Sequence, residues 1–240
     1  MKNSLLLLAL GALSIPAFAQ TATAPKPAAP TAEKKVVKSS GQTSLRFLHA
    51  LPGGPSVDIL VDGAKVSTAL GYKKISAYMP AKSGRRKIQV VATGTSTPIL
   101  IEEPKTFAAD KSFTVAIHGT KSAPKLLFIT DSSKMAEGRT KVRATHLVFG
   151  GPTVLLTTPS TRAEAGFAKF LAQPLAFGET KSKTFKPTAN KLQIRTPEGK
   201  LLKESAELKF DANQQLGIYV LGEANGTGDN ALDIVSAPIK

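Results

Sequence analysis

The sequence of 240 residues contains no cysteine and no tryptophan. Without cysteine the chain has no disulfides, no thiol catalysis and no cysteine-ligated metal centre, so its stability must come from buried core area. Aromatic residues make up only 6% of the chain, which argues against stacking platforms for sugars or single-stranded nucleic acid. The G-x-S-x-G elbow, the P-loop, H-E-x-x-H and the EF-hand loop are also missing. We therefore expect no catalytic residue, no cofactor and a non-enzymatic protein.

Long apolar runs are missing too, except for one at residues 5–15. Lys2 precedes this run, and the small-x-small pattern of residues 17–19 follows it, which is typical of a cleaved export signal. The run is too short to cross a bilayer. The sequence therefore predicts a signal peptide at residues 1–19, an exported protein of the periplasm or cell surface, and no transmembrane segment.

Residues 20–42 are dominated by proline, alanine, threonine and lysine. Such a composition cannot bury enough apolar surface to fold. We expect a disordered basic linker between the signal peptide and the folded part of the chain.

The chain is strongly basic, with a formal net charge of +15 that falls by one when Lys2 is removed with the signal. This charge predicts attraction to anionic partners, and export makes nucleic acid an unexpected one. The candidate anion-binding or partner-binding residues are Lys73, Lys74, Lys82, Arg85, Arg86 and Lys87. Arginine pairs well with carboxylate and phosphate. A glycine-centred hairpin at residues 82–87 would project Lys82, Arg85 and Arg86 together, with Lys73 and Lys74 nearby. The alternative is that this loop is a solvated hairpin tip that serves solubility.

One stretch, residues 44–63, is echoed at residues 141–159. Each copy runs from an arginine through a histidine to a Gly-Gly-Pro turn and then an alternating apolar run. The repeated positions are Arg46, His49 and Pro55 in the first copy and Arg143, His146 and Pro152 in the second. The period of two predicts strand, turn and strand, with Asp58 on the face turned toward water. Asp62 and Gly63 are a hairpin signal.

The repeat predicts two similar domains, at residues 43–135 and 138–240. Short apolar runs, including one at residues 75–79, alternate with turn signals, which is typical of an antiparallel β-sandwich or barrel. The spacing between equivalent residues grows along the chain, so the second copy contains an insertion. We assign it to residues 161–173, where Phe167, Phe170 and Leu171 would lie on one face of a short helix.

The pattern R-F-L-H-A-x-P-x-x-P-x-V-D-I-x-V-D-G, followed by L-G-Y-K-x-I-S-A-Y, resembles the uncharacterised DUF4397 domain family. The matching positions are Arg46, His49, Ala50, Pro52, Pro55, Val57, Asp58, Val61, Asp62, Gly63, Tyr72, Ser76 and Tyr78. The resemblance implies an exported, commonly duplicated domain with an immunoglobulin- or transthyretin-like sandwich and no established activity. The second copy departs from the pattern, with Leu155 in place of Asp58 and Leu221 in place of His118.

We expect a cell-envelope binding or scaffolding protein that contacts a protein or an anionic polymer through loops or sheet edges. One alternative is a periplasmic metal-binding protein or hydrolase that uses His49, Asp58 and His118. A metal site needs three or four ligands. The competing interpretation is a structural role, in which His49 and Arg46, just before the turn, bond the turn backbone. Another alternative is a homo-oligomeric surface-layer component.

Overall fold

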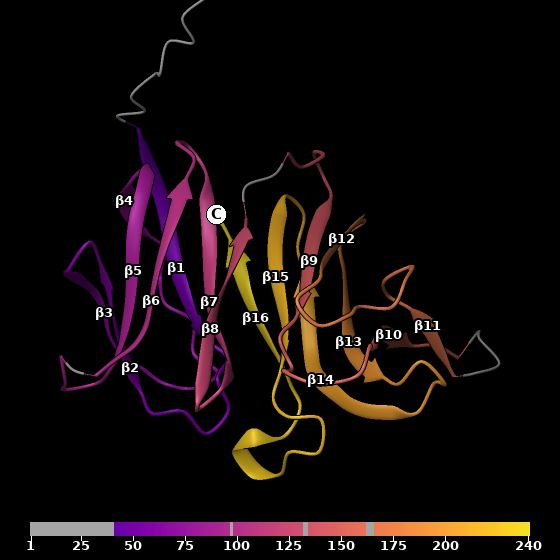
Figure 1. The fold of residues 1–240 in the computed structure, drawn as a ribbon. Coiled ribbons are helices and arrows are strands. Elements are labelled where there is room, and N and C mark those ends of the chain that lie inside the picture. The colour runs from indigo at the N-terminus through magenta and orange to yellow at the C-terminus, as the bar shows by residue number, and fades with distance from the viewer. Residues whose placement is uncertain (1–40, 97, 132–133, 162–165) are drawn as a thin grey trace, which may run out of the picture. The chain divides into compact units, whose positions relative to one another are not determined.

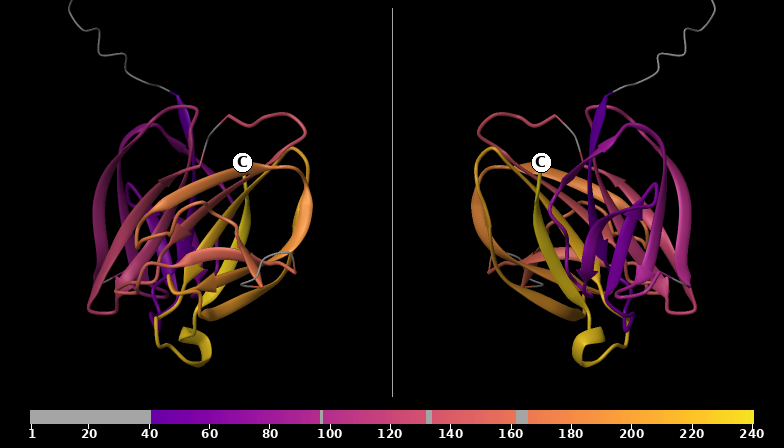
Figure 2. Two further views of the ribbon diagram at one scale, coloured as in Figure 1. Left: turned by 90° about the vertical axis from the view of Figure 1, so that its right-hand side faces the viewer. Right: turned by 90° about the vertical axis from the view of Figure 1, so that its left-hand side faces the viewer.

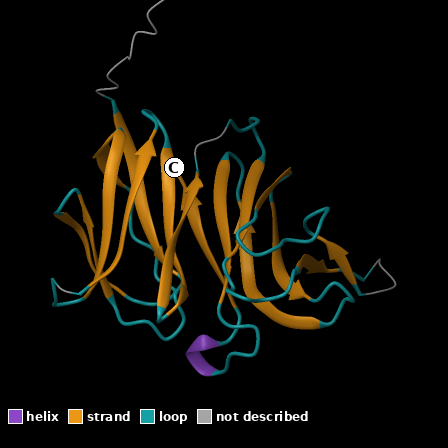
Figure 3. Ribbon diagram, viewed as in Figure 1, coloured by secondary structure: helices purple, strands orange, loops and turns teal. Residues whose placement is uncertain are grey.

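The chain folds from strands joined by turns and loops (Figures 1 and 3). The computed structural model describes residues 41–240 except 97, 132–133 and 162–165, and these described residues belong to one compact unit. The predicted signal peptide and nearly all of the predicted linker lie outside the described residues. Within the described part, no helix is long and apolar enough to cross a membrane.

The strands form four sheets of four strands each, in two groups. The first group contains β1 (Gln42–His49), β2 (Val57–Val61), β3 (Ala64–Leu70), β4 (Met79–Lys82), β5 (Gly84–Ala92), β6 (Ile99–Phe107), β7 (Ser112–Thr120) and β8 (Ala123–Thr130). Its sheets have the orders β4-β1-β7-β8 and β3-β2-β5-β6.

The second group contains β9 (Thr140–His146), β10 (Leu155–Pro159), β11 (Phe167–Lys169), β12 (Thr180–Phe185), β13 (Thr188–Arg195), β14 (Leu201–Phe210), β15 (Gln214–Leu221), the single-turn 3₁₀ helix η1 (Gly228–Asn230) and β16 (Asp233–Ile239). Its sheets have the orders β12-β9-β15-β16 and β11-β10-β13-β14. Each position in the first group therefore has a counterpart at the same place in the second. The predicted all-β class is confirmed, and the repeat seen in the sequence extends to the order of the strands.

One strand pair in each group is parallel, which the antiparallel prediction did not include. β1 pairs in parallel with β7, and β9 with β15, while the other strand pairs between neighbours are antiparallel. Parallel pairs are favoured where both faces of a sheet are covered. On one face of β1 and β7, Phe47 and Val115 pack into the core of the first group. On the other face, Leu48 and Ala116 pack against Leu147, Tyr219 and Leu221 of the second group.

We call this contact between the two groups the seam. It explains why β7 is buried at every position from Ser112 to Gly119 rather than at alternate positions. Figure 2 shows the same strands from two further sides.

Three local predictions need correction. The run at residues 75–79 is not a strand, because Ile75 makes only an isolated bridge with Leu48 and the strand begins at Met79. The described part of the predicted helix at residues 161–173 holds strand β11, which pairs with β10. Asp58 is buried rather than turned toward water.

Candidate functional site

His49 closes the Gly-Gly-Pro turn that follows it. The backbone N–H of Leu51 donates to Nδ1 of His49 at 3.3 Å, and Nε2 lies 2.9 Å from the carbonyl oxygen of Pro55. Because Nδ1 accepts a hydrogen bond, the ring proton must be on Nε2, which donates to Pro55. The structural role that the sequence predicts for His49 is confirmed, and both of its ring nitrogens are used.

His146 closes the second Gly-Gly-Pro turn in the same way. The N–H of Val148 donates to its Nδ1 at 3.2 Å, and its Nε2 lies 3.1 Å from the carbonyl oxygen of Pro152. Burial lowers the pKa of His49 and of His146 below the usual 6.5. Both rings are therefore neutral near pH 7, and neither offers a free nitrogen to a metal or a substrate.

Asp58 is engaged by neighbours on its own hairpin. Its carboxylate accepts hydrogen bonds from Nζ of Lys65 at 2.7 Å and from the backbone N–H of Ala69 at 2.9 Å. Ala69 has a positive φ of 48°, and register shifts between β2 and β3 let its N–H reach the carboxylate. The hydrogen bond from Lys65 holds the pKa of Asp58 below its usual range. This local pairing is the physical reason that Asp58 is buried rather than exposed.

His118 does not meet His49. Ile117 is the register partner of His49 in the parallel β1–β7 pair, and successive side chains on a strand point to opposite faces. His118 therefore turns toward the seam, where its ring lies 5.4 Å from the ring of Phe177. Among the described residues, no group of three or more histidine, aspartate or glutamate side chains is arranged to hold a metal ion.

Arg46 is the centre of a buried polar cluster that joins the two groups. Its Nε donates to the hydroxyl of Thr114 at 2.8 Å, and its Nη2 donates to the hydroxyl of Tyr219 at 2.8 Å. Its Nη1 donates to the carbonyl oxygen of Pro238 at 2.5 Å. The guanidinium also lies over the ring of Tyr78, 4.5 Å from its centre. The prediction that Arg46 bonds the turn, as His49 does, is wrong, because its side chain points into the seam.

Asp131, directly after β8, completes this cluster. Its Oδ2 accepts from the hydroxyls of Thr114 at 2.5 Å and Tyr78 at 2.7 Å, and it lies 3.8 Å from Nε of Arg46. Because the Thr114 proton is used on Asp131, Tyr219 must be the donor in its 3.2 Å contact with Thr114. Burial raises the pKa of Asp131, and the two hydroxyl donors oppose that rise.

Arg143, the counterpart of Arg46, reaches across the seam in the opposite direction. Its Nη1 donates to the backbone carbonyl oxygen of Asp131 at 3.1 Å. It is half-buried, whereas Arg46 is only 2% exposed. Both repeated arginines thus make hydrogen bonds across the seam.

The six candidate anion-binding residues do not form one cluster. Three of them have acidic partners at 2.8 to 3.6 Å: Lys73 with Asp233, Arg86 with Asp62, and Lys87 with Glu102. The side chains of the other three are exposed and make no hydrogen bond or ion pair with a described residue: Lys74, Lys82 and Arg85.

Lys74 lies far from Lys82. The N–H of His49 donates to the carbonyl oxygen of Lys74, at one end of β1, whereas Lys82 pairs with Gln42 at the other end. At about 3.3 Å per residue, the length of β1 separates these ends by roughly 20 Å. The suggestion that residues 73 and 74 support the hairpin at 82–87 is therefore wrong.

The unpaired hairpin charges lie where the described chain begins. The N–H of Ser83 donates to the carbonyl oxygen of Gly41 at 3.0 Å. The N–H of Ser44 donates to the carbonyl oxygen of Lys111 at 2.9 Å, so the exposed Lys111 is at the same end. We call Lys82, Arg85 and Lys111 the basic end. Sequence reasoning found the first two and missed Lys111, which follows Asp110 in a turn with no second basic residue.

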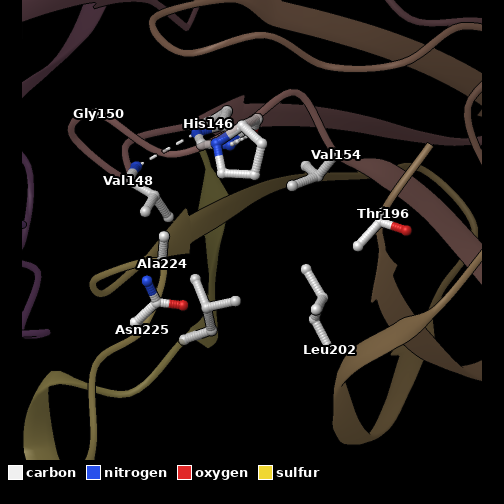
Figure 4. A pocket seen from close by; sticks show the side chains of 10 residues that line it. His146, Val148, Gly150, Val154, Thr196, Leu202, Ala224 and Asn225 are labelled. Carbon is white, nitrogen blue, oxygen red and sulfur yellow. Dashed lines mark hydrogen bonds between the residues drawn. The ribbon is translucent and has the colours of Figure 1, made fainter. Parts of the chain in front are cut away.

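A cavity of about 410 Å³ opens in the second group (Figure 4). Its inner wall is made by the buried side chains of His146, Val148 and Val154. Its outer wall includes Ala224 and Asn225 from the connection between β15 and β16.

Sequence analysis missed this cavity because its lining combines the second Gly-Gly-Pro turn with residues of no special composition from distant parts of the chain. One signal was available: residues 222–232 form a long connection, whereas residues 121 and 122 suffice at the matching place between β7 and β8. In Figure 1 this long connection, in yellow, projects beyond the strand ends.

Comparison with known proteins adds a family and little else. No curated protein matches the chain. Among solved structures, a leucine-rich repeat protein from Bacteroides thetaiotaomicron VPI-5482 is 10% identical, with a TM-score of 0.23, over 78% of this chain and 27% of that one. This chain therefore spans about a quarter of that protein's length. A candidate cell adhesion protein from Parabacteroides distasonis ATCC 8503 is 7% identical, with a TM-score of 0.23, over 83% of this chain and 100% of that one.

The family comparison agrees with the motif read from the sequence. The model of DUF4397, a domain of unknown function, matches residues 43–157. This stretch includes the first group, the junction, β9 and the beginning of β10. The chain is therefore a DUF4397-containing protein.

Proposed function

We propose that this protein is an exported, non-enzymatic binding or scaffolding protein of the cell envelope. Its main contact is an anionic envelope polymer, held by the basic end. The carrying observation is that the side chains of Lys82 and Arg85 are exposed and pair with no acidic group of the described residues, at the point where the described chain begins.

The sequence before this point extends the same charge. Lys34, Lys35 and Lys38 precede Gln42 by a few residues, and a chain spans at most about 3.5 Å per residue. These lysines therefore stay within reach of the same polymer as Lys82. Contiguous positive charge of this kind attracts a polyanion and depends strongly on salt.

A non-enzymatic role is supported by how four of the buried titratable groups are used. His49 and His146 bond turn backbone, Asp58 bonds its own hairpin, and Asp131 bonds side chains at the seam. A general acid or base must be free to exchange a proton with a substrate. Each of these groups is committed to a contact that maintains the fold.

The test measures salt-sensitive retention of the purified protein on isolated cell envelopes. The variant Lys82→Glu/Arg85→Glu reverses two unpaired charges and spares Arg86, whose guanidinium is held by Asp62. The matched control, Lys186→Glu/Lys209→Glu, makes the same change in net charge at exposed lysines of the second group.

We expect the first variant to elute at clearly lower salt than the wild type, and the control to shift much less. Protease treatment of the envelopes should leave retention unchanged if the partner is a polymer. If the two variants eluted at equally lowered salt concentrations, net charge alone would explain retention, and the proposal would be contradicted. Loss of retention after protease treatment would replace the polymer with a protein partner.

A further inference from the structure

We propose that the cavity of the second group binds a small, uncharged, mostly apolar molecule through its alkyl or aromatic part. This site is separate from the basic end, and it adds a ligand to the polymer contact proposed above.

The cavity has the size and the surface of a ligand site. Its volume of about 410 Å³ falls within the range of about 300–1,000 Å³ typical of small-molecule pockets. Val148 and Val154 are buried at its inner wall, and Leu202 and Leu232 are half-buried beside them. When an apolar ligand displaces water from an apolar wall of this kind, the free energy of the system falls, which favours binding.

The cavity wall has few polar groups, and most of them already make hydrogen bonds within the protein. Both nitrogens of His146 bond backbone, so its ring offers the cavity carbon atoms rather than a charge or a proton. The hydroxyl of Thr196 accepts from the N–H of Lys200 at 3.3 Å. Asn225 is exposed and makes no hydrogen bond with a described residue, so its amide is available to one polar group of the ligand.

In the first group, the space over the matching Gly-Gly-Pro turn is occupied by a side chain. Lys121, two residues after Gly119, corresponds to Ala224, two residues after Gly222. Both glycines have positive φ and lie at the ends of matching strands, Gly119 just inside β7 and Gly222 just after β15. A Cβ on Gly53 would lie 2.8 Å from Cε of Lys121, so this lysine lies directly over the first turn. A Cβ on Gly150 would have no described atom within 4 Å. The exchange of lysine for alanine therefore leaves the second turn uncovered.

The outer wall is held by its own backbone. The N–H of Glu223 donates to the carbonyl oxygen of Asn230 at 2.9 Å, and the N–H of Gly226 donates to that of Glu223 at 3.1 Å. Nζ of Lys73, from the first group, lies 3.1 Å from the carboxylate of Asp233 at the end of this connection. The wall is thus formed before a ligand arrives, which lowers the cost of binding.

The absence of charge at the wall selects a neutral ligand. No lysine, arginine, aspartate or glutamate is among the described residues that line the cavity. A charged group moved from water into such a wall loses hydration without gaining a partner. A neutral molecule with one hydrogen-bonding group fits both the wall and the amide of Asn225.

The test is a titration with the neutral fluorescent probe N-phenyl-1-naphthylamine. We expect saturable binding at one site per chain. Ala224→Phe, which fills the cavity from an exposed position, should weaken binding by about tenfold or more. Leu202→Phe fills it from strand β14 and should do the same, which guards against a folding defect in either variant. The matched control Ala212→Phe adds the same ring at an exposed turn away from the cavity and should bind like the wild type.

Competition then tests the charge of the ligand. Among 1-octanol, octanoate and octylamine, which share one alkyl chain, the alcohol should displace the probe at about tenfold lower concentration than either ion. Binding that does not saturate, or that persists in both filled variants, would overturn the site. Equal competition by octanoate or octylamine would overturn the inference that the ligand is uncharged.

Discussion

The two strand groups share one order of strands and differ most where β7 meets β8 and where β15 meets β16. In the first group a tight turn places Lys121 over the Gly-Gly-Pro turn, whereas in the second group an eleven-residue connection stands off from it. The strands and the histidine-closed turns are retained in both, because they form the cores. The connection is free to vary, and with it the surface that can bind a ligand.

The seam shows a second difference between the groups. Arg46 is buried and makes three hydrogen bonds, two of them to the second group, whereas Arg143 is half-buried and makes one across the seam. The two repeated arginines are therefore expected to contribute unequally to the free energy of unfolding.

The largest expected effect comes from removing each of the two arginines in turn. Arg46→Leu leaves Asp131 and the hydroxyl of Tyr219 buried without their cationic partner, so we expect a loss of about 3–5 kcal/mol in the free energy of unfolding. Arg143→Leu removes one hydrogen bond and should cost about 1 kcal/mol. Urea unfolding of both variants measures the difference. Equal losses would mean that the cluster around Arg46 has no special role in stability.

The next effect concerns Gly217, the counterpart of Thr114. A Cβ at Gly217 would lie 2.6 Å from the hydroxyl of Tyr219, so Gly217→Ala should push Tyr219 away from Arg46 and cost about 1–3 kcal/mol. Gly71→Ala is the control, because its Cβ would meet nothing closer than 3.8 Å. A variant at Gly217 that is as stable as the control would contradict this packing.

The two turn histidines, one in each group, should make the stability depend on pH. Burial lowers the pKa of His49 and of His146 in the folded state, so the unfolded chain takes up protons first as the pH falls. Their contribution is present above pH 6.5 and is lost as the pH falls below it. The raised pKa of Asp131 acts in the opposite direction, since it favours the folded state at low pH.

Comparison with the variant His49→Gln/His146→Gln separates these terms. Between pH 7 and pH 5, the unfolding midpoint in urea should fall more steeply for the wild type than for the variant. Parallel curves would show that neither ring must become charged when the turns open.

The smallest effect is expected for Lys121→Ala. Lys121 is exposed, so its loss should change stability by less than about 0.5 kcal/mol. Titration with N-phenyl-1-naphthylamine should still give one site per chain, because the first group lacks the outer wall that residues 222–232 provide. Two sites of equal affinity would make the lysine alone responsible for the difference between the groups.

Local signals predicted much of the fold. Alternation and turn residues located most strands of the first group, Asp62 and Gly63 adopt the positive φ angles of a hairpin turn, and the histidine before each turn bonds its backbone. These features depend on neighbours in sequence. The seam does not: Arg46, Asp131 and Tyr219 meet only because both faces of β1 and β7 are covered. The alternating pattern wrongly predicted that Asp58 faces water, because the residue types do not reveal the shift in register between β2 and β3.

The candidate sites likewise include one that the local sequence predicted and one that it did not. Sequence located the basic hairpin but placed Lys73 and Lys74 beside it, although they lie at the other end of β1. The cavity depends on the absence of a side chain over Gly150, and an absence of that kind leaves no motif. Only the unequal lengths of two connections pointed to it.

The central claim is that the basic end, rather than net charge, holds the envelope partner. Hydrogen–deuterium exchange with and without soluble anionic envelope polymer tests it most directly. The account predicts slower exchange at residues 41–44, 82–87 and 106–111, with no change at the matching residues 186–190 and 209–213 of the second group. Equal protection of both sets, or protection of the second set alone, would contradict it.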